Sequence, residues 1–104
     1  MNKKIVLIVA TILISSIFAV VSFAGQWQKD ELGYRFQNDD GTYKTGWHKD
    51  VDGQWYYLDG SGAMTTGWQS VNGRWYYMGG SGVMFRNTWT PDGRYVDGSG
   101  AWVQ

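Results

Sequence analysis

The sequence predicts an all-β protein: a short solenoid of about four stacked β-hairpins of ~20 residues each, preceded by an N-terminal signal-peptide helix. Three observations predict this fold. Tryptophan recurs at a nearly constant interval, at Trp27, Trp47, Trp68 and Trp89. The residues between these tryptophans are aromatic and turn-forming residues without a helical period. Finally, the first 24 residues are set apart by their apolar composition.

The N-terminal segment has the three parts of a secretory signal peptide. Lys3 and Lys4 precede an almost wholly apolar stretch, residues 5–21, and Ser22-Phe23-Ala24 then places small residues at the third-last and last positions before Gly25. We expect cleavage after Ala24, which leaves residues 25–104 as a secreted array without stable membrane association. An uncleaved anchor is the alternative, since such a run is near the lower limit for spanning a bilayer.

The composition of the remaining chain excludes several classes of protein. The chain has no cysteine, so a disulfide framework and a thiolate metal site are excluded. Aliphatic residues are scarce after residue 24, and the seven Trp and seven Tyr of the chain must supply the packing. Without Lys3 and Lys4, seven basic residues face nine acidic ones, and this balance argues against nucleic-acid binding.

The repeat divides residues 27–104 into units 27–46, 47–67, 68–88 and 89–104. The two central units share Gly-Trp, Trp-Tyr-Tyr and Gly-Ser-Gly elements, and their equivalent residues lie 20 positions apart at Trp55 and Trp75 and at Met64 and Met84. The outer units are degenerate: Tyr34-Arg35-Phe36 replaces the triplet in the first, and the last is shortened. Terminal repeats are expected to be atypical, because one face of each has no neighbour.

Each unit has the pattern of a hairpin. Asp52-Gly53 and Asn72-Gly73 favour a two-residue turn with positive φ at both positions, and the Gly-rich stretches 59–62 and 79–82 form connecting turns. Side chains alternate along a strand, so Trp55 and Tyr57 share one face while Tyr56 and Leu58 share the other. A strict two-residue turn at Asp52-Gly53 would place Trp47 opposite Leu58, away from Trp55. A wider turn, a bulge or strong twist would be needed to bring the two tryptophans together.

These units resemble the choline-binding repeat, also called the cell-wall-binding repeat, of Gram-positive surface proteins and cell-wall hydrolases. The resemblance covers essentially residues 26–104. It implies a β-hairpin solenoid in which choline groups of teichoic acid sit between consecutive hairpins. Choline carries a quaternary ammonium without an N–H, and the negative faces of aromatic rings recognise such a cation.

The resemblance also implies which residues form an aromatic cage around each choline. Such a cage combines the first Trp of a unit, the Trp of the triplet, an aromatic residue of the following unit and a Met on the floor. The implied residues are Trp47, Trp55, Met64, Trp68, Trp75, Tyr77, Met84 and Tyr95. The junction between the Trp47 and Trp68 units retains every element.

The alternative role of each ring is packing in the core without ligand contact. We expect this role for Tyr56, Tyr76, Leu58 and Met78. We expect the only histidine, His48, to be a solvated strand residue. The sequence contains no catalytic motif, no metal-ligand cluster and no cofactor site, so we predict a binding protein and not an enzyme.

The predicted function is thus attachment to choline-bearing, teichoic-acid-type polymers of the cell wall. One alternative is a glucan- or glycan-binding module, because sugars also stack on Trp and Tyr and related repeats of glucan-binding enzymes share this skeleton. The other is a structural spacer with vestigial sites.

Overall fold

The computed structural model describes residues 25–104, and this part of the chain contains strands and no helix. The predicted signal-peptide helix and its cleavage site lie outside the described residues. Eight short strands pair into four separate two-stranded antiparallel sheets. The hairpins are formed by β1 (Gln26–Asp30) and β2 (Gly33–Gln37), β3 (Gly46–Lys49) and β4 (Trp55–Leu58), β5 (Gly67–Val71) and β6 (Arg74–Met78), and β7 (Thr88–Trp89) and β8 (Tyr95–Val96). The predicted all-β hairpin solenoid is confirmed.

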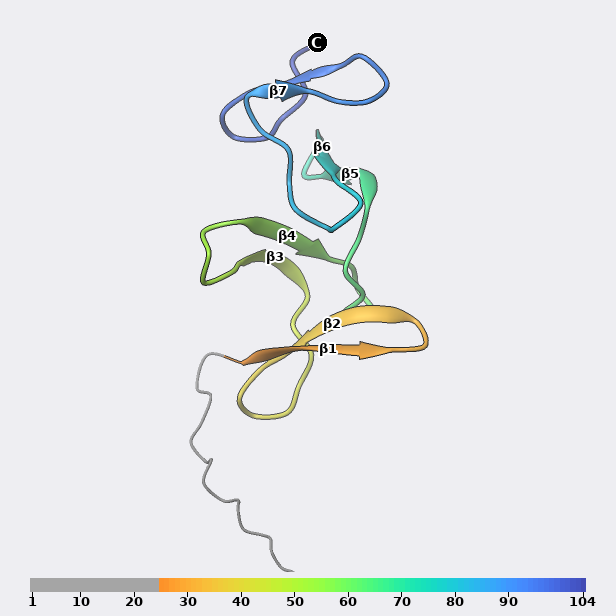
Figure 1. Ribbon diagram of the computed structural model, residues 1–104, viewed down its shortest axis with the longest axis vertical. Coiled ribbons are helices and arrows are strands. Elements are labelled where there is room, and N and C mark those ends of the chain that lie inside the picture. Colours follow the sequence, from red (N-terminus) through yellow and green to blue (C-terminus); the bar gives the residue numbers. More distant parts are fainter. Residues whose placement is uncertain (1–24) are drawn as a thin grey trace, which may run out of the picture.

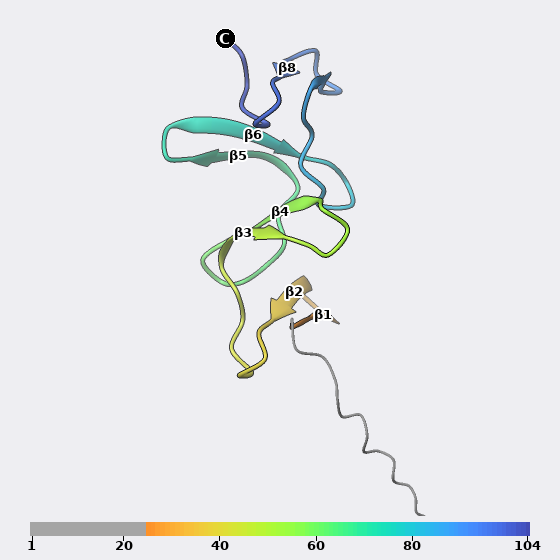
Figure 2. The ribbon, with the colours of Figure 1, turned by 90° about the vertical axis from the view of Figure 1, so that its left-hand side faces the viewer.

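The four hairpins follow one another along the long axis of the molecule (Figure 1). Hairpins β1–β2 and β3–β4 extend to opposite sides of the stack in Figure 1. Hairpin β5–β6 is seen nearly end-on there and lies across the view in Figure 2. No two hairpins share a sheet, so neighbouring units must dock through their turns and aromatic rings.

The turn of hairpin β5–β6 has the predicted two-residue form. Val71 pairs with Arg74, and the intervening Asn72 and Gly73 have φ values of 53° and 81°. Positive φ at both central positions matches the right-handed twist of the flanking strands.

The turn of hairpin β3–β4 is one residue longer, and the two-residue prediction is wrong there. The Asp50 N–H donates to the Gln54 carbonyl at 2.9 Å, the Gly53 N–H donates to the Asp50 carbonyl at 2.9 Å, and Gly53 has a φ of 85°. This is a three-residue loop in which a turn is followed by a left-handed glycine. The Asp52 carboxylate stabilises it by accepting the Gln54 N–H at 2.9 Å.

The longer turn shifts the pairing of the two strands. Trp47 now faces Tyr57, and Gly46 faces Leu58. Because Trp55 lies two residues before Tyr57, it shares a face with Trp47. The wider turn therefore resolves the geometric conflict that a two-residue turn would create.

Backbone hydrogen bonds tie each unit to the next. The N–H of Met64 donates to the Tyr34 carbonyl, and the N–H of Met84 donates to the Trp55 carbonyl, both at 2.8 Å. The Trp102 N–H donates in the same way to the Trp75 carbonyl at 2.9 Å. The donor always follows the Gly-Ser-Gly turn, so this turn sets how adjacent hairpins stack.

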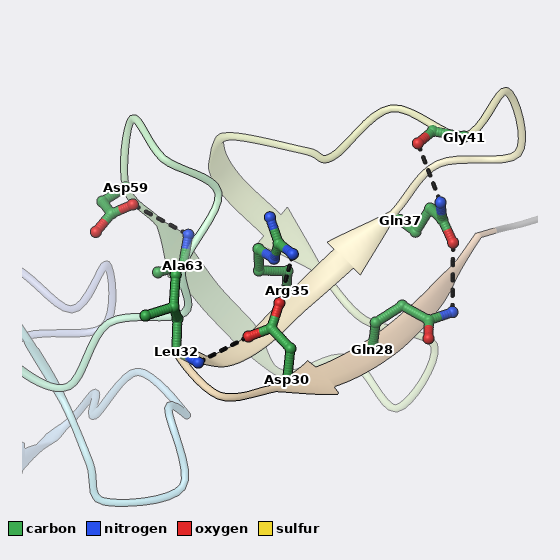
Figure 3. A network of polar contacts seen from close by, with 8 residues as sticks. All are labelled: Gln28, Asp30, Leu32, Arg35, Gln37, Gly41, Asp59 and Ala63. Atoms are coloured by element: carbon green, nitrogen blue, oxygen red, sulfur yellow. Dashed lines mark hydrogen bonds and ion pairs between the residues drawn. The ribbon is translucent and has the colours of Figure 1, made fainter.

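The connecting turns are stabilised by carboxylates. Asp59 accepts hydrogen bonds from the hydroxyl and N–H of Ser61 and from the N–H of Ala63, and Asp97 does the same with Ser99 and Ala101. The serine hydroxyl bond is the largest cause that lowers the pKa of both carboxyl groups. In the first unit, Asp30 accepts from the Leu32 N–H and pairs with Arg35, close to the Asp59 turn of the next unit (Figure 3).

The core is a thin line of side chains along the stack. Leu58, Met78 and Val96 are fully buried, and each pairs across its hairpin with the first residue of the preceding strand: Gly46, Gly67 and Thr88. The core positions predicted for Leu58 and Met78 are confirmed. The same prediction is wrong for Tyr56 and Tyr76, which are half-buried because each lines a cavity between hairpins.

His48 is buried and not solvated, so the prediction for this residue is wrong. Only 5% of it is exposed, because its ring lies 4.0 Å from the ring of Phe36 in the preceding hairpin. Nδ1 lies 3.0 Å from the Lys44 ammonium nitrogen, and Nε2 lies 3.4 Å from Asp50. Burial is the main cause that lowers the pKa of His48 below its ordinary 6.5, and the charge of Lys44 acts in the same direction.

We therefore expect His48 to weaken the fold in mild acid. A histidine whose pKa is lower in the folded than in the unfolded chain binds its proton more readily when unfolded. Its stabilising effect is present above about pH 6.5 and is lost as the pH falls through the folded-state pKa, with a slope of at most about 1.4 kcal/mol per pH unit. Urea unfolding of His48→Gln between pH 7.5 and 5 should show a shallower loss of stability than the wild type. Lys49→Gln, at the exposed neighbouring position, is the control, and equal slopes for H48Q and the wild type would contradict this assignment.

Candidate functional site

Three cavities lie at the junctions between consecutive hairpins, and we call them the first, second and third seams. The second seam is a cavity of about 340 Å³ between the Trp47 unit and the units after it. Its lining residues are Trp47, Trp55, Tyr76, Met84, Arg86, Gly98 and Ser99. The first seam is lined by Trp27, Tyr34, Asp50, Tyr56, Met64, Gly80 and Ser81, and the third by Trp68, Trp75, Arg94 and Trp102.

The rings of the second seam form a box. The Trp47 and Trp55 rings are nearly perpendicular, at 86°, with centroids 6.2 Å apart. Tyr76 reaches over from β6, and its ring lies 4.9 Å from that of Trp47 at 80°. Met84, which is 8% exposed, lines the same cavity. Three ring walls and a polarizable sulfur are suited to a compact, weakly hydrated cation.

The ring from the following unit is Tyr76, where the resemblance implied Tyr77. Alternation along β6 points Tyr76 back toward the preceding hairpin, while Trp75 and Tyr77 point the other way. Tyr77 packs instead against Trp68 at 5.2 Å and Phe85 at 5.1 Å. The same alternation directs Tyr56 toward Trp27, with ring centroids 5.0 Å apart.

The other implied residues are distributed over different cavities. Met64 lines the first seam, Trp68 and Trp75 line the third, and Tyr95 lies beside Trp89 in an outer groove near the C-terminus. The structure thus brings Trp47, Trp55 and Met84 together in the second seam, and Trp68 and Trp75 together in the third.

The first seam repeats the second position by position. Tyr34 stands where Trp55 stands in the second, because Tyr34 pairs with Lys29 as Trp55 pairs with Lys49. The sequence places Tyr34-Arg35-Phe36 at the position of the triplet, but no cage was assigned to this junction because the segment is degenerate. The signal that could have indicated the cage is Tyr34, an aromatic residue seven positions after Trp27. Trp55 follows Trp47 at nearly the same distance, eight positions.

The first seam also has a carboxylate in its wall. The Trp27 indole N–H donates to Asp50 Oδ2 at 3.1 Å. Burial opposes ionisation of Asp50, but hydrogen bonds from Trp27, the Val51 N–H and His48 outweigh it, and the pKa of this carboxyl is lowered. The ionised carboxylate makes the first seam attractive to a cation.

Two glycines leave room for the methionine side chains of these cavities. A Cβ on Gly82 would lie 2.5 Å from the Met64 sulfur, and a Cβ on Gly100 would lie 2.5 Å from the Met84 sulfur. Both glycines have positive φ, at 89° and 88°. The Gly-Ser-Gly turn of one unit therefore positions the methionine of the unit before it.

The described residues offer few other chemical sites. Within residues 25–104, no group of three or more His, Cys, Asp or Glu side chains is placed to hold a metal ion. The same residues include no helix that is long and apolar enough to cross a membrane.

Comparisons with known proteins match this array of hairpins. A family model described as a choline-binding repeat matches residues 44–89. No curated protein sequence matches the chain. Among solved structures, choline binding protein F from Streptococcus pneumoniae is 43% identical with a TM-score of 0.70, over 77% of this chain and 26% of that one.

Two further structures are similar. The choline binding domain of Spr1274 in Streptococcus pneumoniae is 39% identical, with a TM-score of 0.71, over 81% of this chain and 100% of that one. The pneumococcal cell wall endolysin from phage Cp-1, solved complexed with choline, is 35% identical with a TM-score of 0.68 over 81% of this chain. The chain spans about a quarter of the length of choline binding protein F and of the endolysin.

The similarity thus extends over a complete binding domain of one pneumococcal protein and over a repeat module within two longer ones. TM-scores of 0.68 to 0.71 show that these proteins share the stack of hairpins. On this evidence the chain belongs to the choline-binding repeat family.

Proposed function

We propose that this protein is a non-catalytic module that attaches to choline-bearing polymers of a bacterial cell wall. The observation that carries the proposal is the box in the second seam, where the rings of Trp47, Trp55 and Tyr76 line one cavity together with Met84. The corresponding cage in the first seam consists of Trp27, Tyr34, Tyr56 and Met64, with the Asp50 carboxylate as an additional attraction.

The energetics of such a cage explain why it is repeated. Each well-placed ring contributes on the order of 0.5–2 kcal/mol, so three rings correspond to roughly millimolar affinity. Two cages on one rigid array, facing a polymer with many cholines, gain from a high effective concentration. In this proposal residues 1–24 direct export as a signal peptide, and residues 25–104 hold the protein at the cell surface.

Retention on a tertiary-amine resin tests the proposal. We expect the protein comprising residues 25–104 to bind the resin, to be released by free choline, and to change its Trp fluorescence at millimolar choline. Binding to dextran without retention on the amine resin would instead support the glycan-binding alternative. Absence of both kinds of binding would favour a spacer. A clearing zone in cell-wall zymography would contradict the non-catalytic assignment.

A further inference from the structure

We propose that Arg94 supplies an internal cation to the third seam, so that the array holds two quaternary ammonium ions and not three. This inference rests on the proposed function, because it concerns which seams accept the same ligand. It identifies Arg94 as the residue that sets the specificity of the last cavity.

The strand register places Arg94 where a tyrosine completes the other two cages. Tyr95 pairs with Trp89 as Tyr77 pairs with Trp68. The residue before Tyr77 is Tyr76, which lines the second seam, and the residue before Tyr95 is Arg94, which lines the third. A guanidinium thus replaces the negative face of an aromatic ring.

The Arg94 side chain also lies over an aromatic residue of that seam. Its guanidinium carbon lies 5.0 Å from the centroid of the Trp102 ring, within the usual range of a cation–π contact. Trp102 bridges to Val96 as Met84 bridges to Met78, and it therefore stands at the methionine position of the second seam. The third seam provides a ring and the cation that this ring attracts.

A carboxylate fixes the direction of the guanidinium. Arg94 Nη1 donates to Asp92 Oδ2 at 2.8 Å, and the Trp68 indole N–H donates to the same oxygen at 3.0 Å. Nearly half of each side chain in the Arg94–Asp92 pair is exposed, so the ion pair itself adds little to stability. Its effect is to link the guanidinium to Trp68, which also lines the third seam.

A quaternary ammonium entering the third seam would meet a like charge where the other seams offer a ring. The second seam also has an arginine, Arg86, among its lining residues. In residues 25–104, however, the cations that lie over rings are Lys29, Arg35 and Arg94, and the set of rings in the second seam is complete. Arg86 is therefore additional to a cage that has all its rings, whereas Arg94 occupies the position of the tyrosine ring in the third seam.

The first unit contains the same arginine–aromatic pair at the same two positions. Arg35 occupies the position of Tyr56, since it pairs with Gln28 as Tyr56 pairs with His48. Its guanidinium carbon lies 3.9 Å from the ring centroid of Tyr43, which bridges to Gln37 as Met64 bridges to Leu58. In both outer units, therefore, an arginine and an aromatic residue replace the tyrosine and methionine of the central units.

Fluorine NMR of the protein labelled with 5-fluorotryptophan tests the proposal seam by seam, with the signals assigned by single Trp→Phe replacements. During a choline titration of the wild type, we expect the Trp27, Trp47 and Trp55 signals to move with millimolar midpoints. The Trp68 and Trp75 signals should respond at least about tenfold more weakly. In Arg94→Tyr, the Trp68 and Trp75 signals should move with a midpoint within about tenfold of that of Trp47.

Arg74→Tyr is the matched control, because Arg74 is exposed and lies outside the three seams. If Arg94→Tyr disturbs the last hairpin, Arg94→Gln removes the charge alone and should still strengthen the Trp68 response. A wild-type Trp68 response equal to that of Trp47 would overturn this inference and leave the proposed function standing. Unchanged Trp68 signals in both folded Arg94 variants would also overturn it. A wild type whose tryptophans all ignore choline would overturn the proposed function, and this inference with it.

Discussion

Replacing Trp55 with alanine is expected to weaken choline binding at the second seam while the first seam stays active. The substitution removes one of three ring walls and opens the cavity to water, but the Trp55 carbonyl that accepts the Met84 N–H remains. Loss of one ring corresponds to an affinity about 2- to 30-fold weaker. From a millimolar starting point, the second seam then needs a correspondingly higher choline concentration to fill.

The measurement is the choline concentration that elutes the protein from an amine resin, together with the Trp47 signal in a choline titration. Trp55→Tyr is the conservative control, because Tyr34 occupies this position in the first seam. We expect W55Y to retain most of the affinity. Trp89→Ala removes a tryptophan that is 64% exposed and lies outside the three seams, and it should leave elution unchanged. Equal elution of W55A and the wild type would show that the ligand does not sit in the second seam.

Replacing Leu58 with alanine is expected to destabilise the whole array by about 2–5 kcal/mol. Leu58 is fully buried, and an isolated two-stranded hairpin is marginal in water, so the hairpins depend on this thin core. A domain of this size has a total stability of only about 4–12 kcal/mol. The melting temperature should therefore fall by about 10 °C or more.

Thermal unfolding followed by circular dichroism measures this effect. Val51→Ala in the same hairpin is the control, because Val51 is 92% exposed and should shift the melting temperature little. Unfolding in which only the Trp47 unit melts, with the other hairpins intact, would contradict the cooperative stacking that we infer from the bonds between units.

The sequence determined the architecture because the architecture is periodic. Recurring tryptophans, scarce aliphatic residues and Gly-rich turns leave stacked hairpins as the way to bury the rings. The resemblance to the choline-binding repeat implied that Trp47 and Trp55 lie at a junction, and the structure places both in one cavity. Strand alternation directs only one of Tyr76 and Tyr77 toward the preceding unit, and docking between the hairpins makes it Tyr76.

Other features depended on contacts that no local pattern records. The burial of His48 follows from Phe36 in the neighbouring hairpin. The first seam is a cavity because docking of two hairpins places Tyr56 of the second unit against Trp27 of the first. The place of Arg94 in the third seam likewise depends on how two hairpins dock.

The turn at Asp52-Gly53 shows the physical reason most clearly. Both Asp-Gly and Asn-Gly suit a two-residue turn, yet the Asp52 carboxylate accepts a backbone N–H two residues later and stabilises a longer loop. One additional turn residue reverses which side chains share a face of the hairpin, and the sequence alone leaves that choice open. Repetition along the chain thus determined the stack and its rings, whereas strand register and docking between hairpins decided which rings enclose a cavity.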